Sequence, residues 1–443
     1  MYQRSPAFAD IDVIDVDTHL SEPHDLWTSR APARFVDRVP RVERVDGIPT
    51  WVVDGVTLGR ALAAAVIRPD GSKVLGAGGL FTMELDDVHP GASTAGPRLA
   101  VMDELGIWAQ IIYPNAVGFG GQGFGKIADI ELRNLCATIW NDAMAELQEE
   151  SGDRLLPMGI IPWWDLEASV AEVERMHTLG LHGVNTNADP QNQGLPDLSD
   201  AHWDPLWEVM CNYGLPLNFH IGGSVSQASF AGNAKWPSYN DDEGLALGSA
   251  MLYVGNARVI ANLLYSGVLE RHPTLKVVSV ESGIGWIPFM LEALDHQLTE
   301  TAPHLLGTRL TMMPSEYFHR QMYACFWFER RGLVGAIERL GVDNCLFETD
   351  FPHPTCLYPD SLGLAAEALA GTDTQPLTAF VDTVNAWLAQ RLAREPKAIE
   401  RLARLAEASA RINAAARDAE TYNLERKPLV FNVFGLLAEA TRG

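Results

Sequence analysis

Residues Val13–His19, with the sequence VIDVDTH, are a short apolar run that ends in two acids and an imidazole. We expect a buried strand over Val13–Asp17, with the polar residues at its carboxyl end. Because strand side chains alternate with a period of two, Asp17 and His19 face the same side, with Asp15 behind them. Two later runs, Pro216–His220 and Cys345–Asp350, end in the same way. Barrels and open parallel sheets hold their active sites at this edge, so we expect the three strand ends to meet.

Apolar runs of strand length alternate with amphipathic stretches of helical period along most of the chain. The predicted strands are Val13–Asp17, Gln110–Tyr113, Leu155–Ile161, Gly183–Thr186, Leu215–His220, Lys276–Glu281, Met322–Phe328 and Asn344–Glu348. The predicted helices between them are Ile130–Glu150, Leu166–Leu179, Trp203–Tyr213, Trp286–Glu300 and Gly332–Leu340. A strand and helix alternation of this kind is typical of a parallel sheet, and eight units predict a distorted (β/α)8 TIM barrel of the α/β class.

Two regions lie outside this repeat. Residues 24–97 are rich in Pro and Gly and carry hairpin-like pieces at Arg41–Val53 and Val56–Leu58. We interpret them as an insertion after the first strand that caps the carboxyl face as a lid and sets specificity. Residues 375–443 predict helices at Thr378–Leu392 and Ala398–Ala415, followed by an extended arm. The barrel would then comprise residues 1–23 and 98–374, and the apolar segment Pro428–Phe434 is either a subunit contact or packing on its own chain.

Composition narrows the classes of partner. The 443 residues carry a net charge of −24, which argues against nucleic acid and anionic membranes. Five scattered cysteines and the lack of an apolar leader in residues 1–12 lead us to expect a cytoplasmic protein. The longest apolar stretch, Leu245–Leu269, is interrupted by polar residues, so we interpret it as a buried helix and expect no membrane span.

Two imidazoles and two carboxylates at three strand ends suit a divalent metal. We predict Asp17, His19, His220 and Asp350 as its ligands. Taken singly, each has an ordinary alternative, such as a core histidine or a helix-capping acid.

Three further side chains are candidates for roles beside the metal. Glu281 is predicted as a general base or substrate clamp, or as a structural hydrogen-bonding group. His353 is a possible proton donor, a partner of a ligand, or a lid residue. Glu22 either orients a ligand imidazole or is a solvated loop acid.

The chain resembles the amidohydrolase-related metal enzymes of the aminocarboxymuconate-semialdehyde decarboxylase type. The matching motifs are Asp15–Pro23 (DxDxHxxEP), Arg98–Gly106, His220, His272–Pro288 and Thr349–His353 (TDFPH). The resemblance implies a distorted barrel with one divalent ion per chain, zinc first and manganese as the alternative, and a homodimer. It also implies a small carboxylic acid as substrate, and it carries the four metal ligands over to Asp17, His19, His220 and Asp350. The sequence departs from the family at Glu281, where decarboxylases typically have histidine.

Three functions follow from this resemblance. The first is decarboxylation of an aromatic or unsaturated carboxylic acid, in which Asp350 or another acid protonates the carbon that loses carbon dioxide. The second is hydrolysis of an amide, ester or carbon–carbon bond, in which Glu281 or Asp350 takes a proton from an activated water. The third is a metal-binding relative without catalytic activity. We favour decarboxylation.

Overall fold

The computed structural model describes residues 8, 10–76, 79, 82–117, 119, 123–224, 237–369, 384, 385, 399–421, 433 and 436. The chain divides into two compact units, Met1–Leu369 and Ala370–Gly443. All the predicted site residues belong to the first unit.

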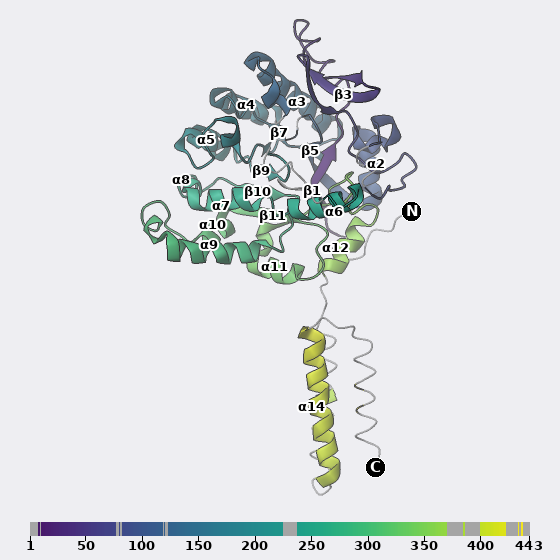
Figure 1. Cartoon of the computed structure of the whole chain (residues 1–443), viewed down its shortest axis with the longest axis vertical. Helices are drawn as coiled ribbons and strands as arrows, with labels where there is room; N and C mark the ends of the chain where they lie inside the picture. Colours follow the sequence, from purple (N-terminus) through teal and green to yellow (C-terminus); the bar gives the residue numbers. More distant parts are fainter. Residues whose placement is uncertain are drawn as a thin grey trace. The chain divides into compact units, whose positions relative to one another are not determined.

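The predicted parallel barrel of the first unit has eight positions, and nine strands fill them because two short strands share one position (Figure 1). Its strands are β1 (Val13–Leu20), β5 (Ile107–Pro114), β6 (Leu155–Pro157), β7 (Gly159–Ile160), β8 (Val184–Asn185), β9 (Leu217–His220), β10 (Val277–Val280), β11 (Met322–Phe326) and β12 (Cys345–Phe347). They pair in the orders β1-β5-β6 and β12-β11-β10-β9-β8-β7, and every pair in these two groups is parallel.

Two short connections join these groups. The backbone N–H of Asp350 donates to the carbonyl of Asp17 at 2.9 Å, and Thr18 bridges Phe351. On the other side, the N–H of Met158 donates to Ile112 while the next N–H, of Gly159, donates to Gly183. The chain therefore changes partners between Met158 and Gly159, which divides the predicted third strand into β6 and β7. The distorted (β/α)8 barrel is confirmed.

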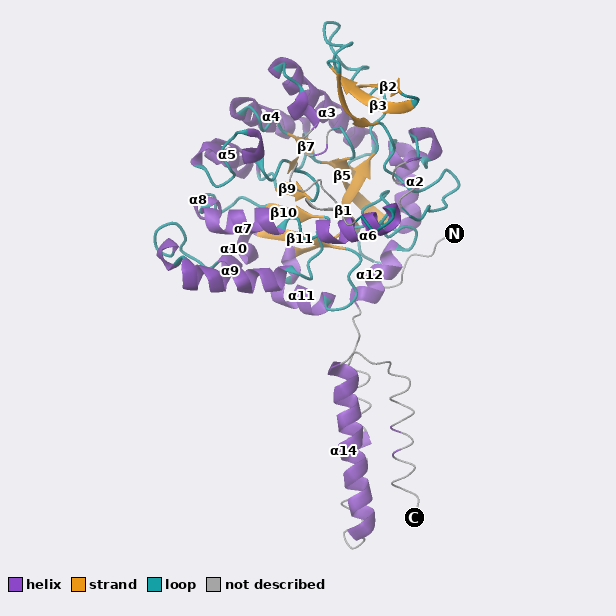
Figure 2. Cartoon of the chain, in the orientation of Figure 1, coloured by secondary structure: helices purple, strands orange, loops and turns teal. Residues whose placement is uncertain are grey.

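Helices surround the strands (Figure 2). In the described part of the first unit they are α2 (Ala95–Leu105), α3 (Ile130–Glu150), α4 (Leu166–Leu179), α5 (Asp204–Tyr213), α6 (Asp241–Leu252), α7 (Ala257–Ser266), α8 (Val268–Arg271), α9 (Ile287–Thr301), α10 (Pro314–Gln321), α11 (Leu333–Leu340) and α12 (Ser361–Leu369). The bounds of α3 and α4 match the prediction because their caps are encoded locally. Asp129 and Asp165 accept backbone N–H groups at the two starts, and Gly180 ends α4 in a left-handed conformation with φ +83°.

The insertion contributes a separate antiparallel sheet, β2 (Arg41–Val45), β3 (Ile48–Val53) and β4 (Val56–Arg60). Trp27 anchors the insertion to the barrel, since it contacts Trp51 of β3 and Trp140 of α3 with ring centroids 5.6 and 6.3 Å apart. At the carboxyl face, the carbonyl of Ala63 accepts hydrogen bonds from the Ser21 hydroxyl and the Asn115 amide. The insertion is thus part of the same packed unit as the barrel.

The prediction of one buried helix over Leu245–Leu269 is wrong for its first half. Helix α7 is buried through Val259, Ile260, Leu263 and Leu264, whereas in α6 Gly248 is the buried residue. By length and composition alone, Asp241–Ser266 reaches the apolarity of a membrane span, with a mean hydropathy of 1.2 and 22% of that window buried. Four apolar residues of α6, Leu245, Ala246, Ala250 and Leu252, line a cavity of the barrel that is described below.

The second unit is described over α14 (Ile399–Thr421), which corresponds to the predicted helix Ala398–Ala415. The predicted helix Thr378–Leu392 lies outside the described residues except for residues 384 and 385. The arm Pro428–Phe434 does so except for Val433, so its role in a subunit contact stays a prediction.

Candidate metal centre

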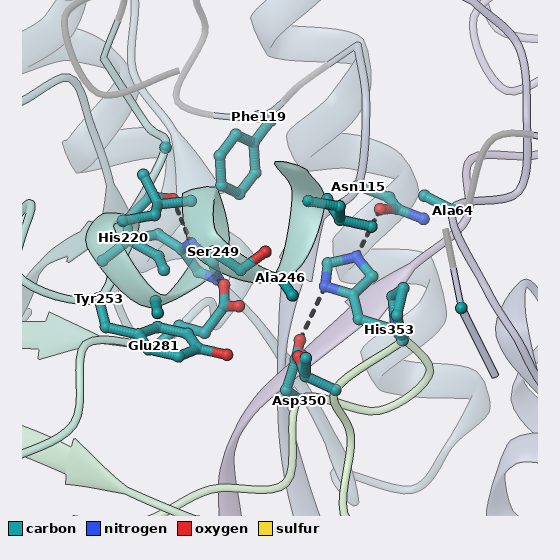
Figure 3. Close-up of a pocket in the computed structure, with 18 of the residues that line it drawn as sticks. Ala64, Asn115, Phe119, His220, Ala246, Ser249, Tyr253, Glu281, Asp350 and His353 are labelled. Carbon is teal, nitrogen blue, oxygen red and sulfur yellow. Dashed lines mark hydrogen bonds and ion pairs between the residues drawn. The ribbon is translucent and has the colours of Figure 1, made fainter. Parts of the chain in front are cut away.

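The three strand ends meet, as the sequence predicts. Asp17 and His19 lie on β1, His220 is the last residue of β9, and Asp350 follows β12. The side chains of Asp17, His19 and Asp350 are 0% exposed and His220 is 1% exposed. The structure therefore brings the four predicted ligands together in the interior of the barrel (Figure 3 shows His220 and Asp350).

The two imidazoles point their Nε2 atoms at each other. Nδ1 of His19 lies 3.0 Å from the carbonyl of Pro114, and Nδ1 of His220 lies 2.8 Å from the carbonyl of Ile221. A carbonyl only accepts, so each Nδ1 carries a proton, and in the neutral form of each ring Nε2 presents a lone pair. The two Nε2 atoms are 3.0 Å apart. Two facing lone pairs repel, and a shared cation would turn this repulsion into ligation.

Carboxylate oxygens surround this pair of nitrogens. Asp17 Oδ1 lies 3.4 Å from His220 Nε2 and 3.6 Å from His19 Nε2, and Asp350 Oδ1 lies 3.8 Å from His19 Nε2. Both carboxylate oxygens of Asp17 are buried and accept no hydrogen bond from any of the described residues. Buried oxygens of this kind fit a metal ion, because desolvating a carboxylate without a partner is costly.

Glu281 belongs to the same cluster. Its Oε2 lies 3.3 Å from His220 Nε2, and the ligand atoms of Asp17, His19, His220 and Glu281 all lie within 4.8 Å of one another. A second group that meets the same limit joins His19, Glu281 and Asp350 to His353. The sequence predicted Glu281 as a base or clamp, and the structure places it where it can also be a ligand.

Burial and mutual repulsion govern the charges of these acids. Burial raises the pKa of Asp17, with a further rise from Asp350, against lowering by His220. The pKa of Glu281 is raised well above its ordinary value by burial and by the neighbouring charges of Asp350 and Asp17. Burial lowers the pKa of His19 well below its ordinary value, which keeps this imidazole neutral and able to ligate. The cluster is thus an unfavourable arrangement of negative charge that a divalent cation would offset.

Two of the cluster residues hold a left-handed backbone. Glu281 has φ +55° and Asp350 has φ +60°, and Ala64, which lines the same cavity, has φ +47°. Such conformations cost non-glycine residues of order 1 kcal/mol or more and persist where surrounding contacts fix them. Here they turn the chain at the ends of β10 and β12, so that both carboxylates face the cluster.

His353 lies between the cluster and the loop after β5. Its Nδ1 is 2.7 Å from Asp350 Oδ1 and its Nε2 is 2.9 Å from Asn115 Oδ1 (Figure 3). Its ring stacks on His19 with the two ring centroids 3.9 Å apart. Burial alone lowers the pKa of His353, but the charge of Asp350 and the hydrogen bond to it outweigh burial, so the pKa is raised. A protonated His353 would donate to both neighbours, which fits the predicted proton donor.

Glu22 holds a loop. Its Oε1 accepts backbone N–H groups of Asn115, Ala116 and Val117 at 3.1, 2.8 and 3.2 Å. One prediction for Glu22 was that it orients a ligand imidazole. The carbonyls of Pro114 and Ile221 orient the two rings through their Nδ1 atoms.

Three residues at the site were not predicted. Glu348 is 0% exposed, and its carboxylate accepts the backbone N–H of Glu281 at 3.1 Å. The period of two counted back from Asp350 points to it. Asn115 directly follows β5, so the rule that strand ends form the site points to it as well. Tyr253, just after α6, carries no signal in the sequence.

A cavity of about 600 Å³ opens beside the cluster. His220, Glu281, Asp350 and His353 form its polar end. The remaining wall is mainly apolar, with Phe119 and Ile221 on one side and residues of α6 on another. The insertion contributes Ala64 and Gly76. A small molecule with one polar and one apolar end would fit this cavity.

Known proteins resemble this chain in sequence and in fold. A family model described as Amidohydrolase matches residues 14–407. Gamma-resorcylate decarboxylase of a Polaromonas species is 28% identical over 265 residues, which is 58% of this chain and 76% of that protein.

Two crystal structures share the fold. An amidohydrolase from Mycobacterium avium subsp. paratuberculosis superposes with a TM-score of 0.64 at 22% identity, covering 82% of this chain and 96% of that one. A dihydroxybenzoic acid decarboxylase from a Polaromonas species, with bound manganese and the inhibitor 2-nitroresorcinol, superposes with a TM-score of 0.50 at 19% identity, covering 80% and 90%.

Proposed function

The chain belongs to the amidohydrolase family and is an enzyme of that superfamily, and on this premise we propose that it decarboxylates an aromatic carboxylic acid with the help of one divalent cation. The observation that carries the proposal is the buried cluster of two facing imidazoles and three carboxylates at the polar end of an apolar cavity. The similarity to gamma-resorcylate decarboxylase supports it, since that relative is named for removing a carboxyl group from an aromatic acid.

The residues that would hold the cation are Asp17, His19, His220 and Asp350, with Glu281 as a fifth donor. The unpaired oxygens of Asp17 and the facing Nε2 atoms support this assignment. The sequence led us to expect zinc, but three carboxylates beside two imidazoles make an oxygen-rich set that suits manganese better. The manganese in the related dihydroxybenzoic acid decarboxylase supports the same choice. We therefore propose manganese as the native ion.

In this scheme a bound cation supplies positive charge beside the substrate carboxylate and a neighbouring oxygen. His353 and Asp350 move the proton, since His353 Nδ1 lies 2.7 Å from Asp350 Oδ1. The proton adds to the ring carbon that bears the carboxylate. The bond from that carbon to the carboxylate then breaks, its electron pair restores the aromatic ring, and carbon dioxide leaves. The apolar wall of the cavity keeps water away from the reacting ring.

The test is decarboxylation in deuterated water by the protein reconstituted with manganese. We expect carbon dioxide and a phenolic product that carries one deuterium at the vacated carbon. His220→Ala should lose the metal, measured by plasma mass spectrometry, together with the activity. His304→Ala, at an exposed position, should keep both. A fully metal-loaded protein that releases carbon dioxide from no hydroxyaryl or unsaturated acid would refute the proposal.

Glu281 favours one second candidate, a hydrolase or hydratase. Its carboxylate lines the cavity 3.3 Å from His220 Nε2, at the position where the family resemblance led us to expect histidine. A carboxylate is a credible base for an attacking water. In this case oxygen-18 from labelled water would enter the product without release of carbon dioxide, and Glu281→Gln would abolish the labelling.

A further inference from the structure

Helix α6 forms one long wall of the cavity. Seven residues of this helix and the turn that follows it line the space, namely Asp242, Leu245, Ala246, Ser249, Ala250, Leu252 and Tyr253. Figure 3 labels three of them, Ala246, Ser249 and Tyr253, around the group of His220, Glu281 and Asp350. The wall is therefore apolar over most of its length, with the carboxylate of Asp242 near the start of the helix and single hydroxyl groups at Ser249 and Tyr253. The predicted lid, residues 24–97, supplies only Ala64 and Gly76 among the described lining residues.

Among its described lining residues, the cavity has carboxylates but no side chain that is positively charged at all ordinary pH values. The described side chains that line it include Glu281, Asp350 and Asp242, but no lysine and no arginine. Asp242 lies near Gly76, where a Cβ on the glycine would be 3.4 Å from Asp242 Oδ1. A carboxylate at the metal end of a substrate would meet the cation and His353. A second carboxylate further along the cavity would meet a mainly apolar wall whose described residues include no lysine and no arginine, and placing a carboxylate against apolar side chains without such a partner is unfavourable.

The volume of the cavity exceeds what one small ring needs. About 600 Å³ lies in the range, roughly 300–1,000 Å³, of pockets that enclose ligands of drug size. The space left beyond a ring at the cluster is bordered by α6, where Ala246 and Ala250 leave room because their side chains are short. An apolar substituent on the ring would fill this space and contact the helix.

We propose that the substrate is an aromatic acid with a single carboxylate and an apolar ring substituent that packs against α6. The proposal rests on the proposed function of the same site and narrows its substrate class. It makes Ala246 and Ala250 specificity-determining residues, and it excludes aromatic dicarboxylic acids as preferred substrates. Each methylene buried against the helix should tighten binding about fourfold.

Binding, measured apart from turnover, tests this proposal. The full chain reconstituted with manganese is titrated by calorimetry with three compounds. They are salicylate, its derivative with a propyl group para to the carboxylate, and its derivative with a second carboxylate at that same position. We expect the propyl compound to bind at least about tenfold more tightly than salicylate, and the carboxy compound at least about tenfold more weakly. Equal affinities of salicylate and the propyl compound, tighter binding of the carboxy compound, or no binding of any of the three would overturn the proposal.

Variants on α6 locate the effect. Ala246 and Ala250 are exposed, so Ala246→Trp and Ala250→Trp should fill the cavity without disturbing the core, and each should remove the advantage of the propyl group. Met251→Trp is the matched control, since Met251 is on the same helix, is 58% exposed and does not line the cavity. If both alanine variants keep the full advantage of the propyl group while their melting temperatures match the parent, the assignment to α6 is wrong.

The outcome is separable from that of the proposed function. The predicted order of affinities without release of carbon dioxide would uphold the substrate class and refute the decarboxylase. Release of carbon dioxide with a preference for the dicarboxylic acid would uphold the decarboxylase and refute the substrate class.

Discussion

His353 is the titratable group with the best-defined proton path. It contacts Asp350 through Nδ1 and Asn115 through Nε2, and its stacking on His19 fixes the ring. Burial lowers the pKa of His353, but the charge of Asp350 and the hydrogen bond to it raise this pKa by more, so the net shift is upward. The protonated form is therefore held to a higher pH than in an ordinary histidine. If this form donates the proton, activity depends on an acid group that is lost on the alkaline side.

We predict that kcat/KM falls as pH rises through a pKa above the ordinary 6.5 of histidine. The sign follows from the raised pKa, because the proton is held below it and released above it. His353→Gln keeps a donor for Asn115 but does not titrate, so its profile should lack this alkaline limb. Rate profiles of both proteins between about pH 5 and 9 measure this. The same limb in the variant would assign the ionisation to another group.

The residues that meet in the candidate metal centre could be predicted from the sequence because their signal is local. Asp17, His19, His220 and Asp350 each end a recognisable apolar run, and the barrel brings such ends together. Glu348 was not predicted, although it lies two residues before Asp350 at the end of the same apolar run. Tyr253 could not be predicted, because its place at the cavity depends on how the chain between β9 and β10 folds back over the barrel.

Among the elements, helices with encoded caps are the most predictable. Asp129 and Asp165 fix the starts of α3 and α4, and the apolar faces of both helices follow the helical period. Helix α6 misled the prediction because its apolar and small residues resemble those of a core helix, whereas they line a cavity. Periodicity cannot distinguish a face that packs on protein from one that faces a ligand.

The insertion makes a testable contribution to stability through Trp27. This side chain is 0% exposed, and its indole N–H donates to the carbonyl of Cys136 at 3.0 Å. Trp27→Ala should lower the free energy of unfolding by about 3–5 kcal/mol, as expected for a buried aromatic residue. Urea unfolding measures the change, and Phe289→Ala, at a position 75% exposed, should change it by roughly 0.5 kcal/mol or less. Equal effects of the two variants would show that the insertion does not stabilise the barrel.

The whole molecule carries a net charge of −24, and it also buries carboxylates, among them Asp17 and Asp350, in the interior of the barrel. Repulsion among Asp17, Glu281 and Asp350 destabilises the folded state, and this cost is absent from the unfolded chain. A cation bound only by the folded chain offsets it and adds its own binding free energy.

We predict that manganese raises the melting temperature and that a chelator lowers it. At a free concentration about 100 times the dissociation constant, the added stability is about 2.7 kcal/mol. Differential scanning calorimetry across a manganese series measures the shift. Asp17→Asn should show a smaller shift in melting temperature at the same manganese concentration. If the melting temperature of the metal-free protein did not change when manganese was added, this result would contradict the proposed site.

Helix α6 lies in the connection between β9 and β10, while the candidate ligands belong to the strand ends themselves. The parts that perform the reaction and the part that selects the substrate therefore belong to different segments of the chain. Mutations in α6 can accumulate without moving a ligand atom, so new preferences can arise by drift in one helix while the chemistry is inherited intact. For protein engineering, this makes twelve consecutive positions, Asp241–Leu252, a compact library for retargeting the enzyme.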